Sequence, residues 1–180
     1  ESHGLRSKAI KAIDETAFYP VKGKERLKSM IETRPDWCVS RQRVWGVPIP
    51  VFLSKKTNKV LIDEEITENI ASIFEKEGAD CWFEGDTQRF LGKKYKSEDY
   101  QKMTDIVEVW FDSGSTHAYV LEKRKDLKWP ASMYLEGSDQ HRGWFHSSLL
   151  ESCGTRGKAP FESILSHGFV VDGKGLKMSK

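Results

Sequence analysis

The hydrophobic positions in the first third of the chain recur with the spacing of amphipathic helices. Apolar residues three or four positions apart predict one helix over residues 5–15 and a second over residues 27–31. The second helix should end before Arg34-Pro35, because the residue before a proline disfavours helical geometry. Between the two helices, Tyr19-Pro20 and Gly23 indicate a turn.

The pattern changes between residues 47 and 107. Prolines within residues 47–53 favour an irregular or edge strand, followed by a turn at Thr57-Asn58 and a return strand over residues 60–62. Asp63 is then expected to cap a helix whose apolar face continues to Gly78. Residues 78–107 are polar and rich in lysine, and predict a loop-rich insertion.

From Ala131 onward the pattern predicts a strand, a helix and a second strand. The strands are expected over residues 132–135 and 164–171, and the helix carries Trp144, Phe145 and Leu149 on one face. This order is typical of a right-handed βαβ unit in a parallel sheet. Ligands of such sheets bind beyond the carboxyl ends of the strands, which here are residues 136–140 and the segment after Val171.

Composition narrows the class of protein. Of the 180 residues, 38% are hydrophobic and 31% are charged, and the net charge is +2, which is typical of a soluble globular domain. No apolar run is long enough to cross a bilayer, and no secretory signal is evident. Cys38, Cys81 and Cys153 lie far apart, which argues against a disulfide framework or a zinc site and favours free thiols in a reducing cytoplasm. The near-neutral charge neither predicts nor excludes a nucleic-acid partner.

The densest cluster of polar side chains follows the first predicted strand of the βαβ unit. It runs from Glu136 to Gly143 and contains two carboxylates, an amide, an imidazole and a guanidinium. Ser138 and Asp139 could simply cap the next helix, and the sequence does not decide between a cap and a ligand contact. A capping role explains Glu136 less well. We interpret Glu136 instead as a residue that binds a ribose hydroxyl or an ammonium group of a ligand.

Three further segments have both a functional and a structural interpretation. The glycine- and lysine-rich residues 173–180 could bind phosphates, although most such loops are solvated turns and the Walker pattern is absent. Trp110 could line an apolar pocket or lie in the core. Arg41 and Arg43, beside Trp45, could contact phosphate or a nucleotide, or could form ion pairs at a domain junction.

Taken together, these motifs resemble the class I aminoacyl-tRNA synthetases, and among them the bacterial isoleucyl-tRNA synthetases. The resemblance covers nearly the whole chain and is weakest across residues 54–107. Leucyl enzymes lack the run from Glu136 to Phe145, and valyl enzymes usually carry a histidine where this chain has Val47. The segments that carry the resemblance are residues 34–46, 110–115, 134–145, 166–169 and 177–180.

The resemblance implies an α/β fold, the second half of a Rossmann-like parallel sheet with an inserted α+β connective region. Residues 1–46 would return from an editing insertion into the catalytic domain. Residues 47–107 would form the connective insertion, and residues 108–180 the second half of the catalytic core.

The resemblance also implies an activity and a set of site residues. The enzyme would join isoleucine to ATP, giving isoleucyl-adenylate, and transfer the acyl group to tRNA(Ile). Lys177 and Lys180 would be catalytic and act on the phosphates, while Trp110 and Trp144 would wall the isoleucine pocket. Mg²⁺ would arrive with ATP, with no protein-bound metal. The residues expected to bind ATP or the adenylate are Glu136, Gly137, Asp139, Gln140, His167 and Ser179.

Several features expected of a whole synthetase do not occur in the sequence. It lacks the His-Ile-Gly-His-type motif of the first half, an editing domain and anticodon-binding helices. We therefore expect a piece of a larger cytoplasmic enzyme that is a monomer as a whole and does not bind membranes. The piece alone should be inactive and should self-associate through an unpaired sheet edge. The alternatives are a valyl or leucyl synthetase piece, or a stand-alone RNA-binding module on the same fold.

Overall fold

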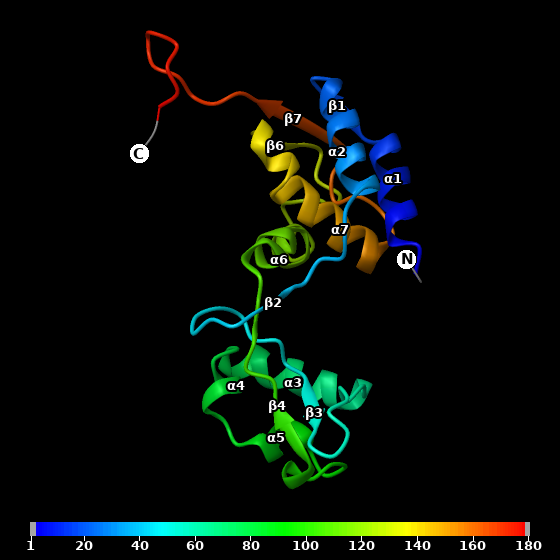
Figure 1. The fold of residues 1–180 in the computed structure, drawn as a ribbon, viewed down its shortest axis with the longest axis vertical. Coiled ribbons are helices and arrows are strands. Elements are labelled where there is room, and N and C mark those ends of the chain that lie inside the picture. The colour runs from blue at the N-terminus through cyan, green and yellow to red at the C-terminus, as the bar shows by residue number, and fades with distance from the viewer. Residues whose placement is uncertain (1–2, 179–180) are drawn as a thin grey trace. The chain divides into compact units, whose positions relative to one another are not determined.

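Three short parallel strands form a sheet from residues of the N-terminal and C-terminal parts of the chain. In the computed structural model, which describes residues 3–178, the strands β1 (Ala17–Tyr19), β7 (Ser163–His167) and β6 (Tyr134–Gly137) lie in the order β1-β7-β6. Both pairings are parallel, and helix α7 (Trp144–Arg156) connects β6 to β7. The predicted parallel βαβ unit is therefore confirmed (Figure 1). The turn predicted near Tyr19 is preceded by β1, which the sequence did not reveal because three residues are too few to display a strand period.

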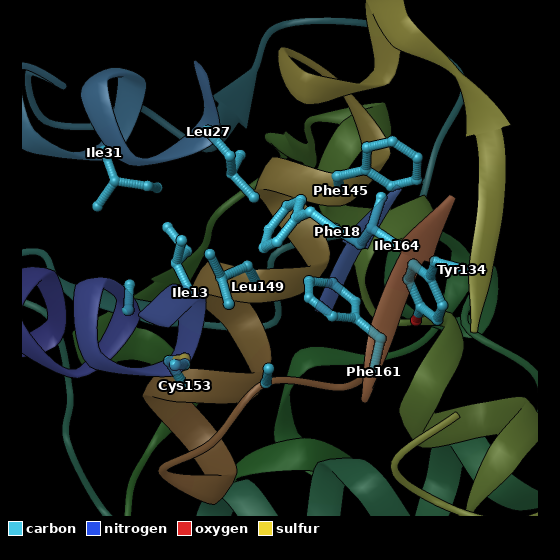
Figure 2. Packing of buried hydrophobic residues seen from close by; sticks show 13 residues of the cluster. Ile13, Phe18, Leu27, Ile31, Tyr134, Phe145, Leu149, Cys153, Phe161 and Ile164 are labelled. Carbon is cyan, nitrogen blue, oxygen red and sulfur yellow. The ribbon is translucent and has the colours of Figure 1, made fainter. Parts of the chain in front are cut away.

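The first helix forms as its apolar spacing predicts, whereas the second begins at Lys22 and so contains Gly23, which was predicted to lie in a turn. Helix α1 (Leu5–Glu15) buries Ala9, Ala12 and Ile13, and helix α2 (Lys22–Glu32) ends before Arg34-Pro35. Their buried faces meet α7 and the sheet in one core (Figure 2). The buried members of this core are Ala9, Ala12, Ile13, Phe18, Leu27, Ile31, Tyr134, Phe145, Leu149, Cys153, Ala159, Phe161 and Ile164.

Two compact units divide the chain: Glu1–Trp37 with Val109–Lys180, called the first unit, and Cys38–Glu108, called the second unit. The division after Trp37 differs from the expected one after residue 46. The reason is that β2 (Ser40–Arg41) pairs with β5 (Ile106–Val107), which ties residues 38–46 into the second unit. Within residues 3–178, every helix falls short of the length and hydropathy that a bilayer crossing requires.

The second unit has its own apolar core, formed by Phe52, Ile66, Ile70, Trp82, Phe90 and Leu91. The predicted helix after Asp63 is confirmed as α3 (Glu64–Glu77), with the Asp63 Oδ1 atom accepting a hydrogen bond from the Ile66 amide at 3.3 Å. The predicted edge strand is confirmed only in part, as β3 (Phe52–Ser54), and the predicted return strand is reduced to a bridge between Leu53 and Val60.

The loop-rich description of residues 78–107 is wrong. This region contains α4 (Cys81–Glu84), α5 (Thr87–Leu91), the 3-10 turn η1 (Ser97–Asp99) and β4 (Tyr100–Lys102), which pairs with β3. Helices of four or five residues are too short to display a helical period. Their positions are instead set by Trp82 and Phe90, whose rings pack 5.0 Å apart in the core.

Substitution of Trp82 by alanine should destabilise the second unit strongly. The side chain is fully buried and its Nε1 atom donates to the Met103 carbonyl at 2.8 Å, so its removal leaves a cavity and an unpaired acceptor. We expect a loss of about 3–5 kcal/mol in the free energy of unfolding, measured by denaturant titration. Replacing the exposed Ile62 by alanine should change it by less than about 0.5 kcal/mol. Equal midpoints for the two variants would contradict the assigned core.

Strand β6 has one hydrogen-bonded neighbour, β7, among the described strands. An edge with free backbone groups is a template for pairing with another chain. We expect the sedimentation coefficient of the 180-residue chain to rise with concentration, and Leu135→Lys, a charge on this edge, to reduce that rise. The same change at Leu127, which is exposed but outside the sheet, should have no effect. A monomer at all concentrations would refute self-association.

Candidate functional site

The carboxyl ends of β6 and β7 meet at one edge of the sheet. Glu136 pairs with Ser166 and Gly137 pairs with His167, so three of the predicted site residues lie in two adjacent rows. Glu136 and His167 are exposed, and the Glu136 Oε1 atom accepts a hydrogen bond from the Gly137 amide at 2.8 Å. A Cβ atom at Gly137 would lie 2.5 Å from Asp139 Oδ1, so glycine allows the chain to turn closely against that carboxylate.

The 3-10 turn η3 (Ser138–His141) carries the polar cluster from β6 to α7. The Gln140 side chain organises this turn: its Oε1 atom accepts from the Trp144 amide at 2.9 Å, and its Nε2 atom donates to Asp139 Oδ2 at 3.2 Å. Gln140 thus satisfies an amide at the start of α7, a task that the sequence left open for Ser138 or Asp139. Asp139 stays exposed at the mouth of the turn, where a ligand could reach it.

His141 anchors the turn from inside. The residue is 1% exposed, its Nδ1 atom lies 2.7 Å from the Ser138 carbonyl oxygen, and its ring meets Phe145 edge-on. Burial lowers the pKa of His141, which keeps the imidazole neutral. A Cβ atom at Gly23 would lie 3.0 Å from its Nε2 atom, so α2 also approaches this ring closely. The role of His141 is therefore to position the turn.

The Trp110 ring approaches Gly143, the residue that precedes Trp144. Trp144 stacks on Tyr134 with ring centroids 4.0 Å apart, and its Nε1 atom donates to the Ser113 carbonyl at 3.0 Å. A Cβ atom at Gly143 would lie 2.9 Å from two ring atoms of Trp110. Trp110, in α6 (Val109–Gly114), keeps 43% of its surface exposed, so it is not a core residue. Trp110 is thus partly exposed beside the polar turn, whereas Trp144 is half-buried and packs against the core.

The segment after β7 folds back as a hairpin, and the predicted strand over residues 164–171 is therefore too long. Val171 bridges Lys177, and Asp172 Oδ1 accepts from the amides of Lys174 at 2.8 Å and Leu176 at 2.9 Å. The Lys177 ammonium lies 3.8 Å from the Phe169 ring centroid.

Within residues 3–178, Lys177 contacts this ring rather than the segment Glu136–Gln140. Figure 1 shows the hairpin leading away from the sheet. The predicted site residues Ser179 and Lys180 lie outside the described residues.

The sequence did not reveal a pocket that is lined in part by the polar side chains of His117 and Glu151. The pocket has a volume of about 670 Å³ and lies between α1, α2, α6 and α7. Burial raises the pKa of Glu151 to about 8, with a further contribution from the Asp112 carboxylate, and burial lowers the pKa of His117. Among its lining residues are Leu5, Ile31, Trp37, Phe111, His117 and Glu151. A single polar residue in a helical segment does not reveal from the sequence that it will lie beside other polar residues at a pocket.

The described residues do not form a candidate metal-binding site. Among residues 3–178, no three His, Cys, Asp or Glu side chains gather in a metal-binding arrangement. The three cysteines are free thiols. Burial raises the pKa of Cys153 to about 12, so this thiol is unreactive. The geometry therefore offers a polar, exposed strand-end turn bordered by indoles as the candidate site.

Comparison with protein-family models shows the family to which the chain belongs. The family described as tRNA synthetases class I (I, L, M and V) matches residues 1–180. The chain belongs to this family. The resemblance seen in the sequence and the expected class I α/β fold are thereby confirmed.

Curated class I relatives with high identity are isoleucine–tRNA ligases. The chain is 78% identical to that of Pelagibacter ubique (strain HTCC1062) over 180 residues, covering 100% of this chain and 20% of the relative. It is 61% identical to that of Brucella abortus biovar 1 (strain 9-941) over 177 residues, 98% of this chain and 18% of the relative. The chain thus spans about a fifth of the length of these class I synthetases.

A solved class I synthetase shares the fold. The leucyl-tRNA synthetase (LeuRS) of Agrobacterium radiobacter K84, in a ternary complex with tRNA and LeuAMS, matches with a TM-score of 0.53 at 21% identity. The match covers 81% of this chain and 21% of that chain. At this identity the likeness concerns the fold alone.

Replacing Glu151 by glutamine should alter how stability depends on pH. The pKa of Glu151 in the fold, about 8, lies above its ordinary value of 4.5, so the protonated carboxyl stabilises the fold fully below pH 4.5. This stabilisation is lost as the pH rises through about 8. We expect Glu151→Gln to gain thermal stability relative to the unaltered protein across that range.

The control for this measurement is Glu162→Gln, at the exposed amino end of β7. Its melting temperature should follow that of the unaltered protein between pH 4.5 and about 8. Parallel pH profiles for all three proteins would refute the raised pKa of Glu151.

Proposed function

We propose that the protein to which this chain belongs is a cytoplasmic isoleucine–tRNA ligase. It would activate isoleucine with Mg²⁺-bound ATP to isoleucyl-adenylate and transfer the acyl group to tRNA(Ile). The observation that carries this proposal is the 78% identity over the whole chain to a protein named isoleucine–tRNA ligase. The same observation favours isoleucine over the valine and leucine alternatives, and a ligase over a stand-alone RNA-binding module.

The strand-end turn supplies the groups that would hold the adenylate. The exposed Glu136 and Asp139 carboxylates can accept hydrogen bonds from an ammonium group or from ribose hydroxyls. Gly137 lets a ligand approach the backbone, and Gln140 fixes the turn through the Trp144 amide. His167, beside Gly137 in the register, would lie at the nucleotide end.

The two indoles would form the wall for the isoleucine side chain. Trp144 is fixed by stacking and by its bond to Ser113, whereas Trp110 is partly exposed and rests on Gly143. A rigid apolar wall discriminates by shape. It cannot reject valine strongly, since one methylene is worth only about 1–3 kcal/mol.

Activation requires no side-chain nucleophile. The isoleucine carboxylate attacks the α-phosphorus, the bond to the bridging oxygen breaks, and pyrophosphate leaves with the electron pair. Catalysis then consists of positioning and of charge stabilisation on the phosphates. Lys177 and Lys180 would supply that charge, with Ser179 beside them. Since Lys177 lies over Phe169, the hairpin after His167 would have to swing toward the turn when ATP binds.

Isoleucine-dependent exchange of pyrophosphate into ATP tests the proposal in the complete protein. Glu136→Gln keeps the shape of the side chain and removes its charge, so kcat/KM for isoleucine should fall about ten- to a hundredfold. Glu162→Gln is the matched control: it lies at the opposite end of the sheet and loses only an exposed pair with Lys128. Its kcat/KM should match that of the unaltered protein.

Two outcomes would contradict the proposal. Exchange that depends on another amino acid and not on isoleucine would refute the assigned substrate. Equal kcat/KM values for the Glu136→Gln and Glu162→Gln proteins would refute the site. We expect the 180-residue chain by itself to catalyse no exchange.

A further inference from the structure

The pocket beside Glu151 belongs entirely to the first unit, and the strand-end turn contributes no residue to it. Its volume of about 670 Å³ lies within the range of small-molecule sites, roughly 300–1,000 Å³. Part of its wall is apolar and includes Leu5, Ile31 and the rings of Trp37 and Phe111, whose centroids are 6.0 Å apart. A pocket of this size and lining can hold the apolar body of a small organic molecule.

Two hydrogen-bond acceptors of the pocket lining gather around Gly114. His117 is 1% exposed, and its Nδ1 atom lies 3.0 Å from the Gly114 carbonyl oxygen. Because a carbonyl oxygen only accepts, Nδ1 carries the proton, and Nε2 of the neutral ring is an acceptor. Glu151 Oε1 is the second acceptor, and a Cβ atom at Gly114 would clash with it. Within residues 3–178, neither His117 Nε2 nor Glu151 Oε1 has a hydrogen-bond partner, and a buried acceptor without a donor is costly.

Two arginines that line the pocket donate their hydrogen bonds elsewhere. Arg6 donates to the carbonyl oxygens of Glu32 and Arg34, both at 2.8 Å. Arg156 donates to both carboxylate oxygens of Glu122, each at 2.9 Å. These guanidinium groups therefore satisfy other acceptors, and a donor for the two acceptors at Gly114 has to come from a ligand.

The charge around Glu151 favours a cation as that donor. Burial raises the pKa of Glu151 to about 8, and the Asp112 carboxylate raises it further. A positive charge beside a carboxyl group favours its ionised form and so offsets both effects. A ligand carbonyl could pair with protonated Glu151, but it would leave the acceptor of His117 without a donor. A cationic N–H donor suits both groups.

We propose that this pocket binds an organic ammonium ion with an apolar body. The ammonium group donates hydrogen bonds to Glu151 Oε1 and His117 Nε2, and its three N–H donors are enough for both. The apolar body lies against Leu5, Ile31 and the two aromatic rings, which also attract a cation through their faces. The inference does not depend on the proposed ligase activity, because the residues assigned to the adenylate do not line this pocket.

Three probes with the same apolar body separate charge from hydrogen bonding in the unaltered complete protein. Isothermal titration calorimetry with saturating isoleucine should show binding of phenethylamine. Neutral 2-phenylethanol should bind at least about tenfold more weakly, because it lacks the charge that the Glu151 carboxylate would meet. Phenethyltrimethylammonium keeps the charge but has no N–H donor, and should bind at least about fivefold more weakly than phenethylamine.

Substitutions in the complete protein then locate the site. Glu151→Gln keeps the shape of the side chain and removes its charge, and should raise the Kd of phenethylamine at least about tenfold. The Kd of 2-phenylethanol should stay the same in this variant. Glu162→Gln is the matched control, since Glu162 is exposed and does not line the pocket, and its Kd for phenethylamine should equal that of the unaltered protein.

Three results would overturn the inference. Absence of phenethylamine binding to the complete protein would mean that another part of that protein covers the pocket. An equal Kd in Glu151→Gln and the unaltered protein would remove the carboxylate from the site. A Kd that rises in Glu136→Gln instead would place the ammonium at the strand-end turn. Because binding is measured without ATP, it can fail while isoleucine activation succeeds, and the reverse.

Discussion

The parallel register between β6 and β7 is the constraint on which the candidate site depends. It sets Glu136 beside Ser166 and Gly137 beside His167, so that a polar turn and the start of the C-terminal hairpin leave the sheet together. A slip of one residue would turn Glu136 to the opposite face of the sheet. The register is held by burial of Tyr134 and Ile164, which pair across the two strands inside the core (Figure 2).

Helix α7 connects the paired strands β6 and β7 and packs against the rest of the first unit. Its first residues receive the Gln140 side chain and carry Trp144, while its buried side contributes Phe145 and Leu149 to the core. The same helix contains a carboxyl, Glu151, whose burial opposes ionisation.

The second unit shows how a small core can support an exposed loop. Aromatic rings that pack against Trp82 in tilted or edge-on geometry stabilise short helices that have little stability of their own. The β2–β5 pairing then fixes the two ends of the loop that carries Trp45. The stability of the second unit thus rests mainly on the residues around Trp82, and the position of the loop on the β2–β5 pairing.

The sequence by itself determined the longer helices, the parallel strand-helix-strand unit and the family, because these depend on local period and on runs of specific residues. The βαβ order also located the polar turn at Glu136–Gln140. Only the tertiary structure decided the strand β1, the short helices around Trp82, the division after Trp37 and the Glu151 pocket. Each of these arises from contacts between residues distant in the chain, and such contacts leave no periodic trace in the sequence.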